Sequence, residues 1–361
     1  MAQAFLNVTQ PIEAKNADVA RFIERSLAEY DIPEGVKVIG TYAFCYCTAL
    51  KRVTIPESVT AIYANAFRYT GLTELVLPTN CSLLESYALY ESKELKILKA
   101  GNLKKIKNNV FDKNTKCVLY DFTNCTEVPQ LDNVNAFGSI NPEAKIYVLS
   151  HLYNEWIEAT NWVELADHII PAEHSQEVAI PEYSSRGLAT YGYGNGECAV
   201  TGRGECTDSV VVITDECASG QITNILDGAF LYDGDIEELF IMGSVKSIGN
   251  TVCNGSGLKK LYMENVRSVL SIAFMCDNLE YVRFSSNIQY IGGKSFVSNG
   301  KKTVYDFTAF TGDSIPELEW EAGVPGSTLS PEKILVPIDR YNEWRSATNW
   351  SYYADKIFPA K

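Results

Sequence analysis

The feature that most constrains this chain is an apolar phrase that returns every 21 to 23 residues. Most copies have an aliphatic residue, then a small residue and an aromatic ring four and five positions later, then an L-x-x-V-x-I stretch. The leading aliphatic residues are Ile39, Ile62, Leu84 and Ile106 in the first half, and Ile225, Ile248, Val269 and Ile291 in the second. A period of this length predicts a solenoid, because one unit covers its apolar edge only by stacking on its neighbours.

The phrase also predicts the structure of one coil. In the stretch from Leu50 to Ile55, Val53 and Ile55 alternate as in a strand with one buried face. A proline that follows, such as Pro56, ends the strand because it has no N–H to donate. The small residue beside the aromatic one lets a second short segment approach closely while the ring fills the core. Stacked coils are therefore expected to form parallel sheets of short strands.

The chain also contains a second, longer repeat, which divides it into two halves. The stretch YNEWIEATNW, Tyr153 to Trp162, returns as YNEWRSATNW, Tyr341 to Trp350, and 13 of the 20 positions that start at these tyrosines are identical. A solenoid has two open ends that need covering, and Tyr153, Trp156 and Thr160 recur at helical spacing. We therefore predict two lobes, each closed by a C-terminal helical cap. The predicted cap residues are Tyr153, Trp156 and Trp162 in the first copy, and Tyr341, Trp344 and Trp350 in the second.

These patterns give a domain map. Residues 1–172 form a first lobe with a C-terminal cap over 150–172, residues 173–195 form a polar linker, and residues 196–361 form a second lobe with a cap over 338–361. Within 13–27, Val19, Phe22, Ile23 and Leu27 share one helical face. That segment is predicted to be a helix that covers the start of the first lobe; the alternative is a helix that docks to a larger assembly.

The stretch from Ala43 to Pro56 reads A-F-x-x-C-x-x-L-x-x-V-x-I-P and resembles the unit of the BspA-like leucine-rich repeat family. The resemblance implies an α/β solenoid of two tandem lobes of parallel short strands, each with a C-terminal helical cap. Residues 196–215 are similar to the opening hairpin of many such domains. BspA-like proteins are mostly bacterial surface proteins that adhere to host matrix proteins or to other cells, and similar domains occur in parasitic protozoa.

Several kinds of chemistry find no support in the sequence. The net charge of −14 argues against nucleic acid or anionic lipid as a partner. No metal site is predicted: Cys45-Tyr46-Cys47 lacks a second ligand pair, and His168 becomes Lys356 in the second copy. No motif for catalysis or for a cofactor is present, so we expect a protein that is not an enzyme and needs no cofactor.

Most of the ten cysteines fall at core positions of the coil, where a free thiol acts as a small hydrophobic group. Cys198 and Cys206 differ, because they flank the turn of the predicted opening hairpin, and these two could form a disulfide.

A solenoid without catalytic groups works through its surface, so the outward strand positions are the candidate binding residues. In the second lobe, Phe240, Tyr262 and Arg283 fall in one column across successive strands, with Tyr281 and Lys260 beside it. Aromatic residues and arginine are enriched at binding hot spots. The alternative is ordinary cross-strand packing. The same column in the first lobe, Thr54, Val76, Lys99 and Asp121, is more polar.

The sequence therefore predicts an adhesion or protein–protein interaction module whose sheet faces bind a protein or glycan on a host or cell surface. The alternative is a structural component of a larger assembly, such as a phage virion or a surface layer. No run of 18 apolar residues exists, so no membrane insertion is expected. The family implies surface exposure, yet the first residues carry no secretory signal. The signal was removed, or the protein acts in a virion or in the cytoplasm.

Overall fold

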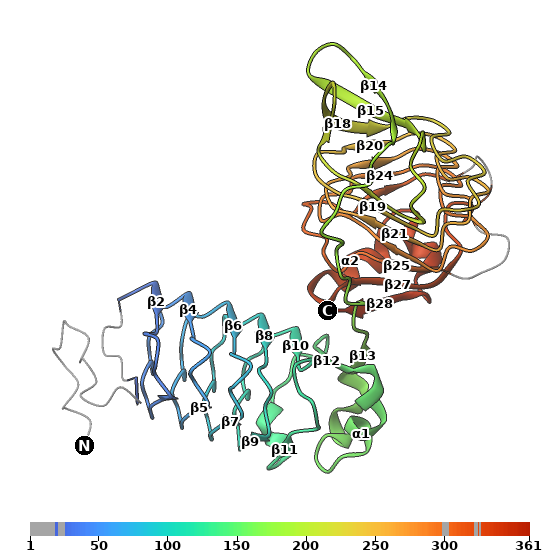
Figure 1. The fold of residues 1–361 in the computed structure, drawn as a ribbon. Helices are drawn as coiled ribbons and strands as arrows, with labels where there is room; N and C mark the ends of the chain where they lie inside the picture. Colours follow the sequence, from blue (N-terminus) through green and yellow to red (C-terminus); the bar gives the residue numbers. More distant parts are fainter. Residues whose placement is uncertain (1–18, 21–25, 298–302, 321–323, 325) are drawn as a thin grey trace, which may run out of the picture. The chain divides into compact units, whose positions relative to one another are not determined.

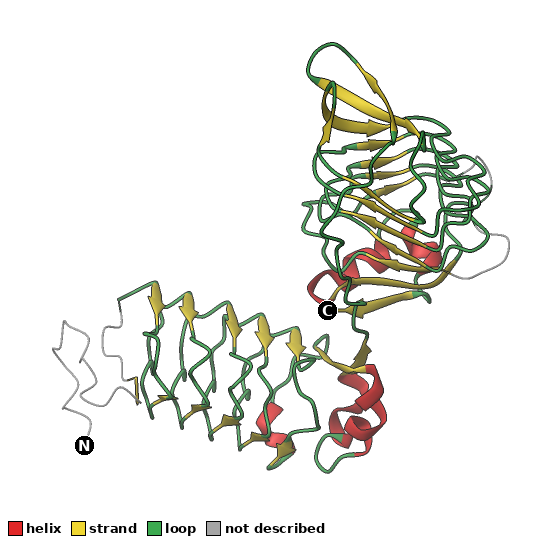
Figure 2. Cartoon of the chain, in the orientation of Figure 1, coloured by secondary structure: helices red, strands yellow, loops and turns green. Residues whose placement is uncertain are grey.

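The computed structural model describes residues 19–20, 26–297, 303–320, 324 and 326–361. The chain divides into two compact units, residues 1–172 and residues 173–361, which we call lobe 1 and lobe 2 (Figure 1). In the described part of each lobe, short strands alternate with loops in successive coils, and helix is confined to a few short segments (Figure 2).

Lobe 1 contains two parallel sheets and one parallel strand pair. The first sheet contains β1 (Val19–Ala20), β3 (Val38–Ile39), β5 (Ala61–Ile62), β7 (Leu83–Leu84), β9 (Lys105–Ile106) and β11 (Gln130–Leu131). The second contains β6 (Glu74–Val76), β8 (Ile97–Lys99), β10 (Leu119–Asp121), β12 (Lys145–Leu149) and β13 (Ile169–Ala172). The pair is β2 (Glu29–Asp31) with β4 (Arg52–Thr54). Neighbouring strands come from consecutive coils, as a solenoid requires.

Lobe 2 repeats this plan with longer sheets. Its seven-stranded sheet contains β16 (Val210–Ile213), β19 (Glu238–Ile241), β21 (Lys260–Met263), β23 (Tyr281–Arg283), β25 (Thr303–Asp306), β27 (Pro331–Pro337) and β28 (Ile357–Ala360). Its eight-stranded sheet contains β14 (Ala189–Gly192), β15 (Glu197–Gly202), β17 (Glu216–Cys217), β18 (Gly220–Ile225), β20 (Ser247–Ile248), β22 (Ser268–Val269), β24 (Tyr290–Ile291) and β26 (Glu317–Leu318). The predicted solenoid of parallel short strands is confirmed.

Each lobe has its own core, built from the positions that the repeat marks as apolar. The ring of Phe44 stacks on that of Phe67 in the next coil, with centroids 5.0 Å apart. Phe274 and Phe296 stack in the same way in lobe 2, at 5.3 Å. Such stacks, and aliphatic residues at the same position in other coils, remove apolar surface from water between coils and help to hold them together.

In lobe 1 the second segment of a coil is a tight turn with a left-handed residue on either side of the apolar pair that packs in the core. In the first coil these residues are Tyr42 and Tyr46, with φ of 61° and 63°. The amide of Tyr46 donates to the carbonyl of Arg68 in the next coil at 2.9 Å. Such hydrogen bonds repeat from coil to coil, so the turns stack in register and their side chains line up on one surface of the lobe.

The duplicated stretch closes both solenoids in the same way. In lobe 1, α1 (Tyr153–Glu158) buries Trp156, and the indole N–H of Trp162 donates to the carbonyl of Pro129 at 2.8 Å. Asn161 adopts a left-handed φ of 67° and donates to the carbonyl of Leu131 at 2.7 Å. The last coil therefore receives hydrogen bonds on carbonyls that no further coil would satisfy.

Lobe 2 reproduces these contacts residue for residue. In α2 (Tyr341–Ser346) the buried ring is Trp344, and Trp350 donates to the carbonyl of Pro316 at 2.8 Å. The remaining cap segments are the 3₁₀ helices η2 (Ser150–Leu152), η3 (Val163–His168), η4 (Ile338–Arg340) and η5 (Trp350–Tyr353), while η1 (Val134–Phe137) lies in the last coil of lobe 1. The caps are only partly helical, because β13 and β28 end each lobe as edge strands. Thr160 lies beyond the end of α1, so the predicted helical stripe is shorter than expected.

Two sequence predictions about the lobe openings are wrong where the structure describes them. Within the helix expected over 13–27, Val19 and Ala20 form β1 and pair with Val38 and Ile39, and Ser26 and Leu27 are not helical. The rest of that segment lies outside the described residues. The strand of the first coil, β3, has backbone groups free to pair on its outer side. At Val19 and Ala20, hydrogen bonding to this strand decides the conformation, although the sequence has helical periodicity there.

The opening hairpin of lobe 2 is also displaced from the expected 196–215. β15 pairs antiparallel with β14, through a turn that contains Gly194 and Gly196 at φ of 80° and 86°, whereas β16 belongs to the other sheet. Two glycines with left-handed backbones permit this tight turn. Residues 203–209 therefore carry the chain from one sheet to the other, as in later coils.

Candidate functional site

The predicted column of lobe 2 lies together on one face of the seven-stranded sheet, but that face is not open. Phe240, Tyr262 and Tyr281 are only 2%, 6% and 5% exposed. The rings of Phe240 and Tyr262 stack with centroids 4.4 Å apart, and Tyr281 follows at 5.9 Å. With Val212 they form a second apolar cluster, on the side of the sheet opposite the lobe core. The prediction of an exposed aromatic ridge is therefore wrong.

The segment that covers the column is the predicted linker. Residues 173–188, which we call the strap, run along this face of lobe 2 before the chain enters β14 (Figure 1). Val178 of the strap packs against the aromatic cluster. The polar composition of this segment suggested a free linker, because one valine and a set of backbone anchors leave no periodic signal in the sequence.

The charged residues of the column are paired with neighbours. Arg283 donates from Nε to Oδ2 of the buried Asp306 at 3.3 Å, and the hydroxyl of Tyr281 donates to the same oxygen. Burial raises the pKa of Tyr281, and the Asp306 carboxylate raises it further, so the phenol stays protonated as a donor. Lys260 forms an ion pair with Glu238 at 2.9 Å.

In lobe 1 the corresponding positions carry no aromatic column. Thr54 and Val76 are exposed, Lys99 is half-buried and pairs with Glu74 at 3.1 Å, and Asp121 is buried. This face is therefore mixed in chemistry, as the sequence predicts.

An exposed aromatic surface lies elsewhere in lobe 1, on the stacked turns. It contains Tyr46, Tyr69, Tyr87 and Tyr90 together with Arg68 and Lys113, and we call it the tyrosine face. Tyr46 and Tyr69 stack at 4.6 Å, and Tyr69 and Tyr87 both meet Tyr90 edge-on. Tyr46 is 49% exposed and Tyr87 is 38% exposed.

Arg68 organises the tyrosine face. Its guanidinium carbon lies 4.8 Å from the ring centres of both Tyr69 and Tyr90, and 5.8 Å from that of Tyr87. It also donates to the side-chain oxygen of Asn65 at 3.1 Å. Cation–π contacts on several rings hold the tyrosines in one arrangement before any partner arrives. The repeat period contains the signal for this face, since Tyr46 and Tyr69 occupy the same turn position in successive coils; sequence reasoning missed it by considering only strand positions.

The disulfide of lobe 2 differs from the predicted one. Cys198 is bonded to Cys217, not to Cys206, which is a buried thiol. Cys198 on β15 and Cys217 on β17 both lie beside β18, which pairs with each of these strands. The disulfide therefore joins two strands of the lobe opening, whereas Cys206 lies on the crossing between the sheets.

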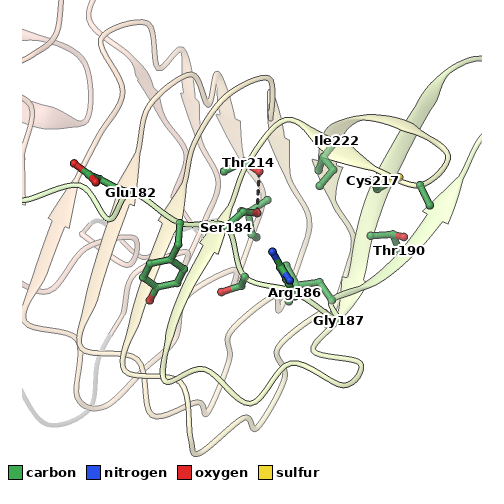
Figure 3. Close-up of a pocket in the computed structure, with 13 residues that line it drawn as sticks. Glu182, Ser184, Arg186, Gly187, Thr190, Thr214, Cys217 and Ile222 are labelled. Atoms are coloured by element: carbon green, nitrogen blue, oxygen red, sulfur yellow. Dashed lines mark hydrogen bonds between the residues drawn. The ribbon is translucent and has the colours of Figure 1, made fainter.

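A partly open cavity of about 790 Å³ lies between the second half of the strap and the strands β16 to β18 (Figure 3). Glu182 and Arg186 are the only charged residues in its described lining, and both are exposed. Ser184 exchanges a hydrogen bond with Thr214 at 2.9 Å. Cys217 is held in the disulfide, and the hydroxyl of Ser185, also in the lining, donates to the carboxylate of Asp208 at 2.7 Å.

Across the described part of the chain, no group of three or more His, Cys, Asp or Glu side chains is placed to hold a metal ion. Nor is any described helix long and apolar enough to cross a membrane.

Comparison with known proteins agrees with the repeat architecture. The profile of the BspA type leucine rich repeat region matches residues 18–141 and 213–311, in six copies. These residues amount to more than half of the chain, so the protein belongs to the BspA-type leucine-rich repeat family. A search of curated protein sequences found no match.

Similar solved structures include a leucine rich cell surface protein from Faecalibacterium prausnitzii (18% identity, TM-score 0.22), with 82% of this chain and 60% of that chain covered. A second is a leucine-rich repeat protein from Bacteroides ovatus (15% identity, TM-score 0.24). The match covers 84% of this chain and 87% of that chain. A third is the pneumococcal vaccine antigen PcpA (13% identity, TM-score 0.28). The match covers 91% of this chain and 77% of that chain. The chain thus spans about 60% of the length of the F. prausnitzii protein.

Proposed function

We propose that this chain is a non-enzymatic adhesion module that binds another protein at a host or cell surface, and that lobe 1 makes this contact through its tyrosine face. The observation that supports the proposal is the preorganised cluster of four tyrosines around Arg68. Tyrosine gives a large amphipathic contact area at low entropic cost, and tyrosine and arginine dominate binding hot spots.

The arrangement of the rings favours a protein over a glycan as the partner. Tyr46 and Tyr69 stack face to face, at an interplanar angle of 13°, and Arg68 covers faces of Tyr69 and Tyr90. The stack covers one face each of Tyr46 and Tyr69, and Arg68 covers faces of Tyr69 and Tyr90, so these rings offer a sugar ring less open face than isolated tyrosines would. Hydroxyls and ring edges suit the mixed polar and apolar surface of a protein.

The test is binding of the wild-type chain and of Tyr46→Ser/Tyr87→Ser to a panel of purified extracellular-matrix proteins, with a glycan array run in parallel. Both side chains are substantially exposed, so folding should be nearly unchanged, and circular dichroism checks this. We expect at least a tenfold loss of affinity for the matrix protein that wild type binds, or about 1.4 kcal/mol.

Lobe 2 supplies the matched control. Tyr232 occupies the turn position equivalent to Tyr46 and is 73% exposed. Tyr232→Ser should leave binding unchanged. Equal binding by wild type and the double variant would reject the tyrosine face, and binding to glycans without binding to proteins would reject the partner class.

A further inference from the structure

The strap is fastened at both ends to lobe 2. At its start, the amide of Glu173 donates to the carbonyl of Pro359 at 2.8 Å, and that of Ser175 to Lys361 at 2.9 Å. At its far end, the amide of Ser185 donates to the carbonyl of Val212 at 2.9 Å. These anchors place the strap directly over the aromatic column.

The centre of the strap is held differently. Residues 177–182 are all described, and none of their backbone groups is hydrogen-bonded to the sheet. Pro181 has no N–H to donate. Ile180 is 58% exposed, and only Val178 packs on the aromatic cluster. Backbone without hydrogen bonds and with few apolar contacts belongs to the low-stability end of a structure.

The centre also fails to fill the face that it covers. A cavity of about 250 Å³ lies beneath it, lined by Val178 and Ile180 from the strap and by Phe240, Met242 and Tyr262 from the sheet. The lining on the sheet side is mostly apolar. The pocket is partly open to solvent, so a segment whose side chains filled it would bury apolar surface that the strap leaves in contact with water.

Arg283 adds a hydrogen-bond donor to this face, which any segment that lies there has to satisfy. Its Nη2 donates to the carbonyl of Gln176 and, at 3.1 Å, to the hydroxyl of Ser175. Asp306 holds the guanidinium from the other side at 3.2 Å. The guanidinium of Arg283 is thus fixed where it can donate a hydrogen bond to a main-chain carbonyl beside the aromatic column.

We propose that the Phe240–Tyr262–Arg283 face is a binding site for an extended peptide segment of another protein, and that the strap covers it in cis. The segment that fits is an extended chain with aliphatic side chains at alternating positions and a main-chain carbonyl at Arg283. The strap itself demonstrates this chemistry with Val178, Ile180 and the Gln176 carbonyl. A partner binds by displacing residues 176–182, including the Gln176 carbonyl at Arg283, while the backbone hydrogen bonds of Glu173, Ser175 and Ser185 stay in place. This site is separate from the tyrosine face and does not depend on it.

The probe is a fluorescent peptide with the sequence of residues 173–186, EHSQEVAIPEYSSR. In the intact chain the tethered strap competes at a high effective concentration, so the added peptide should bind weakly. The full-length variant Val178→Ser/Ile180→Ser weakens this competitor and leaves the sheet face unchanged. We expect the variant to bind the peptide at least tenfold more tightly than wild type, by fluorescence anisotropy.

Two controls separate this outcome from unspecific binding. Adding Arg283→Gln to the variant should weaken peptide binding at least fivefold, and a scrambled peptide should not bind. Equal binding of the peptide to wild type and variant, or no binding to either, would overturn the proposal.

Hydrogen exchange on the wild-type chain gives a second, independent readout. Residues 177–182 should exchange quickly, whereas the amides of Glu173, Ser175 and Ser185 should be protected. Equal protection along the whole strap would make it a fixed structural element and would refute displacement. The proposed function of lobe 1 would survive either failure, because its variants leave lobe 2 untouched.

Discussion

Each cap contains two buried tryptophans whose rings meet edge to face. The two differ in whether the indole N–H has a hydrogen-bond partner. Trp156 and Trp162 are both fully buried, with centroids 4.5 Å apart. The indole N–H of Trp162 donates to Pro129, whereas that of Trp156 has no hydrogen-bond partner in the described structure. Lobe 2 repeats the difference, with Trp350 bonded and Trp344 without a partner.

This difference predicts a ranking of conservative substitutions. Trp156→Phe and Trp162→Phe lose similar apolar volume, but Trp162→Phe also leaves the Pro129 carbonyl without its donor. We expect Trp162→Phe to lower the free energy of unfolding by about 1 kcal/mol more than Trp156→Phe. Chemical denaturation measures both, and Trp350→Phe against Trp344→Phe is the matched pair in lobe 2. Equal costs in both pairs would mean that the indole hydrogen bond adds nothing.

The buried cysteines allow a second prediction at this scale. Burial raises the pKa of Cys81 and of Cys117 to about 12, and that of Cys276 to about 11. A raised pKa keeps the thiol neutral, so at pH 8 fewer than about one in a thousand of these groups is a reactive thiolate. Ellman's reagent should therefore leave them unmodified in the folded chain.

Unfolding the chain in denaturant should then expose eight reactive thiols, and the remaining two should react only after a reductant is added. Ten thiols without reductant would contradict the Cys198–Cys217 disulfide. Rapid modification of Cys81 in the folded chain would contradict its burial.

At the scale of elements, the sequence was sufficient wherever a structure follows the period. The strand positions, the stacked rings such as Phe44 on Phe67, and the two capping stretches all repeat, so each copy supports the assignment of the others. The lobe openings do not repeat. β1, the β14–β15 hairpin and the strap depend on which backbone groups a neighbouring coil leaves available, and that is visible only in three dimensions.

Some features of the candidate site could likewise be predicted from the sequence, and others could not. The column of Phe240 and Tyr262 was assigned to the correct sheet face, because strand alternation fixes where side chains point. Its exposure was not predictable, since a single valine in a polar segment gives no signal of packing. The tyrosine face was within reach of sequence reasoning, because Tyr46 and Tyr69 share one turn position of the repeat and Arg68 and Tyr90 share the position before it.

The strap leads to a prediction about an element as a whole. A fragment that begins at residue 189 leaves Phe240 and Tyr262 uncovered, whereas a fragment that begins at residue 173 keeps them buried. Exposing this cluster should lower the free energy of unfolding by about 1–3 kcal/mol, after allowance for the entropy that the strap no longer loses. The shorter fragment should also bind a hydrophobic dye that the longer one does not. Equal stability and equal dye binding would mean that the strap does not protect the column.

At the scale of the whole molecule, the repeated cap implies that each solenoid ends within its own half of the chain. Each lobe has a separate core, and the compact units meet between residues 172 and 173. The strap packs on lobe 2, so we propose that the domain boundary lies at its start and not at residue 195. Limited proteolysis should accordingly spare the anchored strap ends.

Two independent solenoids should unfold in two steps, and the caps allow each step to be assigned. Trp156→Ala empties a buried site in lobe 1 and should destabilise that lobe by about 3–5 kcal/mol, while Trp344→Ala should do the same in lobe 2. In differential scanning calorimetry, each variant should lower one transition and leave the other at its wild-type temperature. Fragments 1–172 and 173–361 should each reproduce one of the two transitions. A single transition that both variants lower equally would show that the lobes unfold as one cooperative unit, because two independent cores cannot share the cost of one cavity.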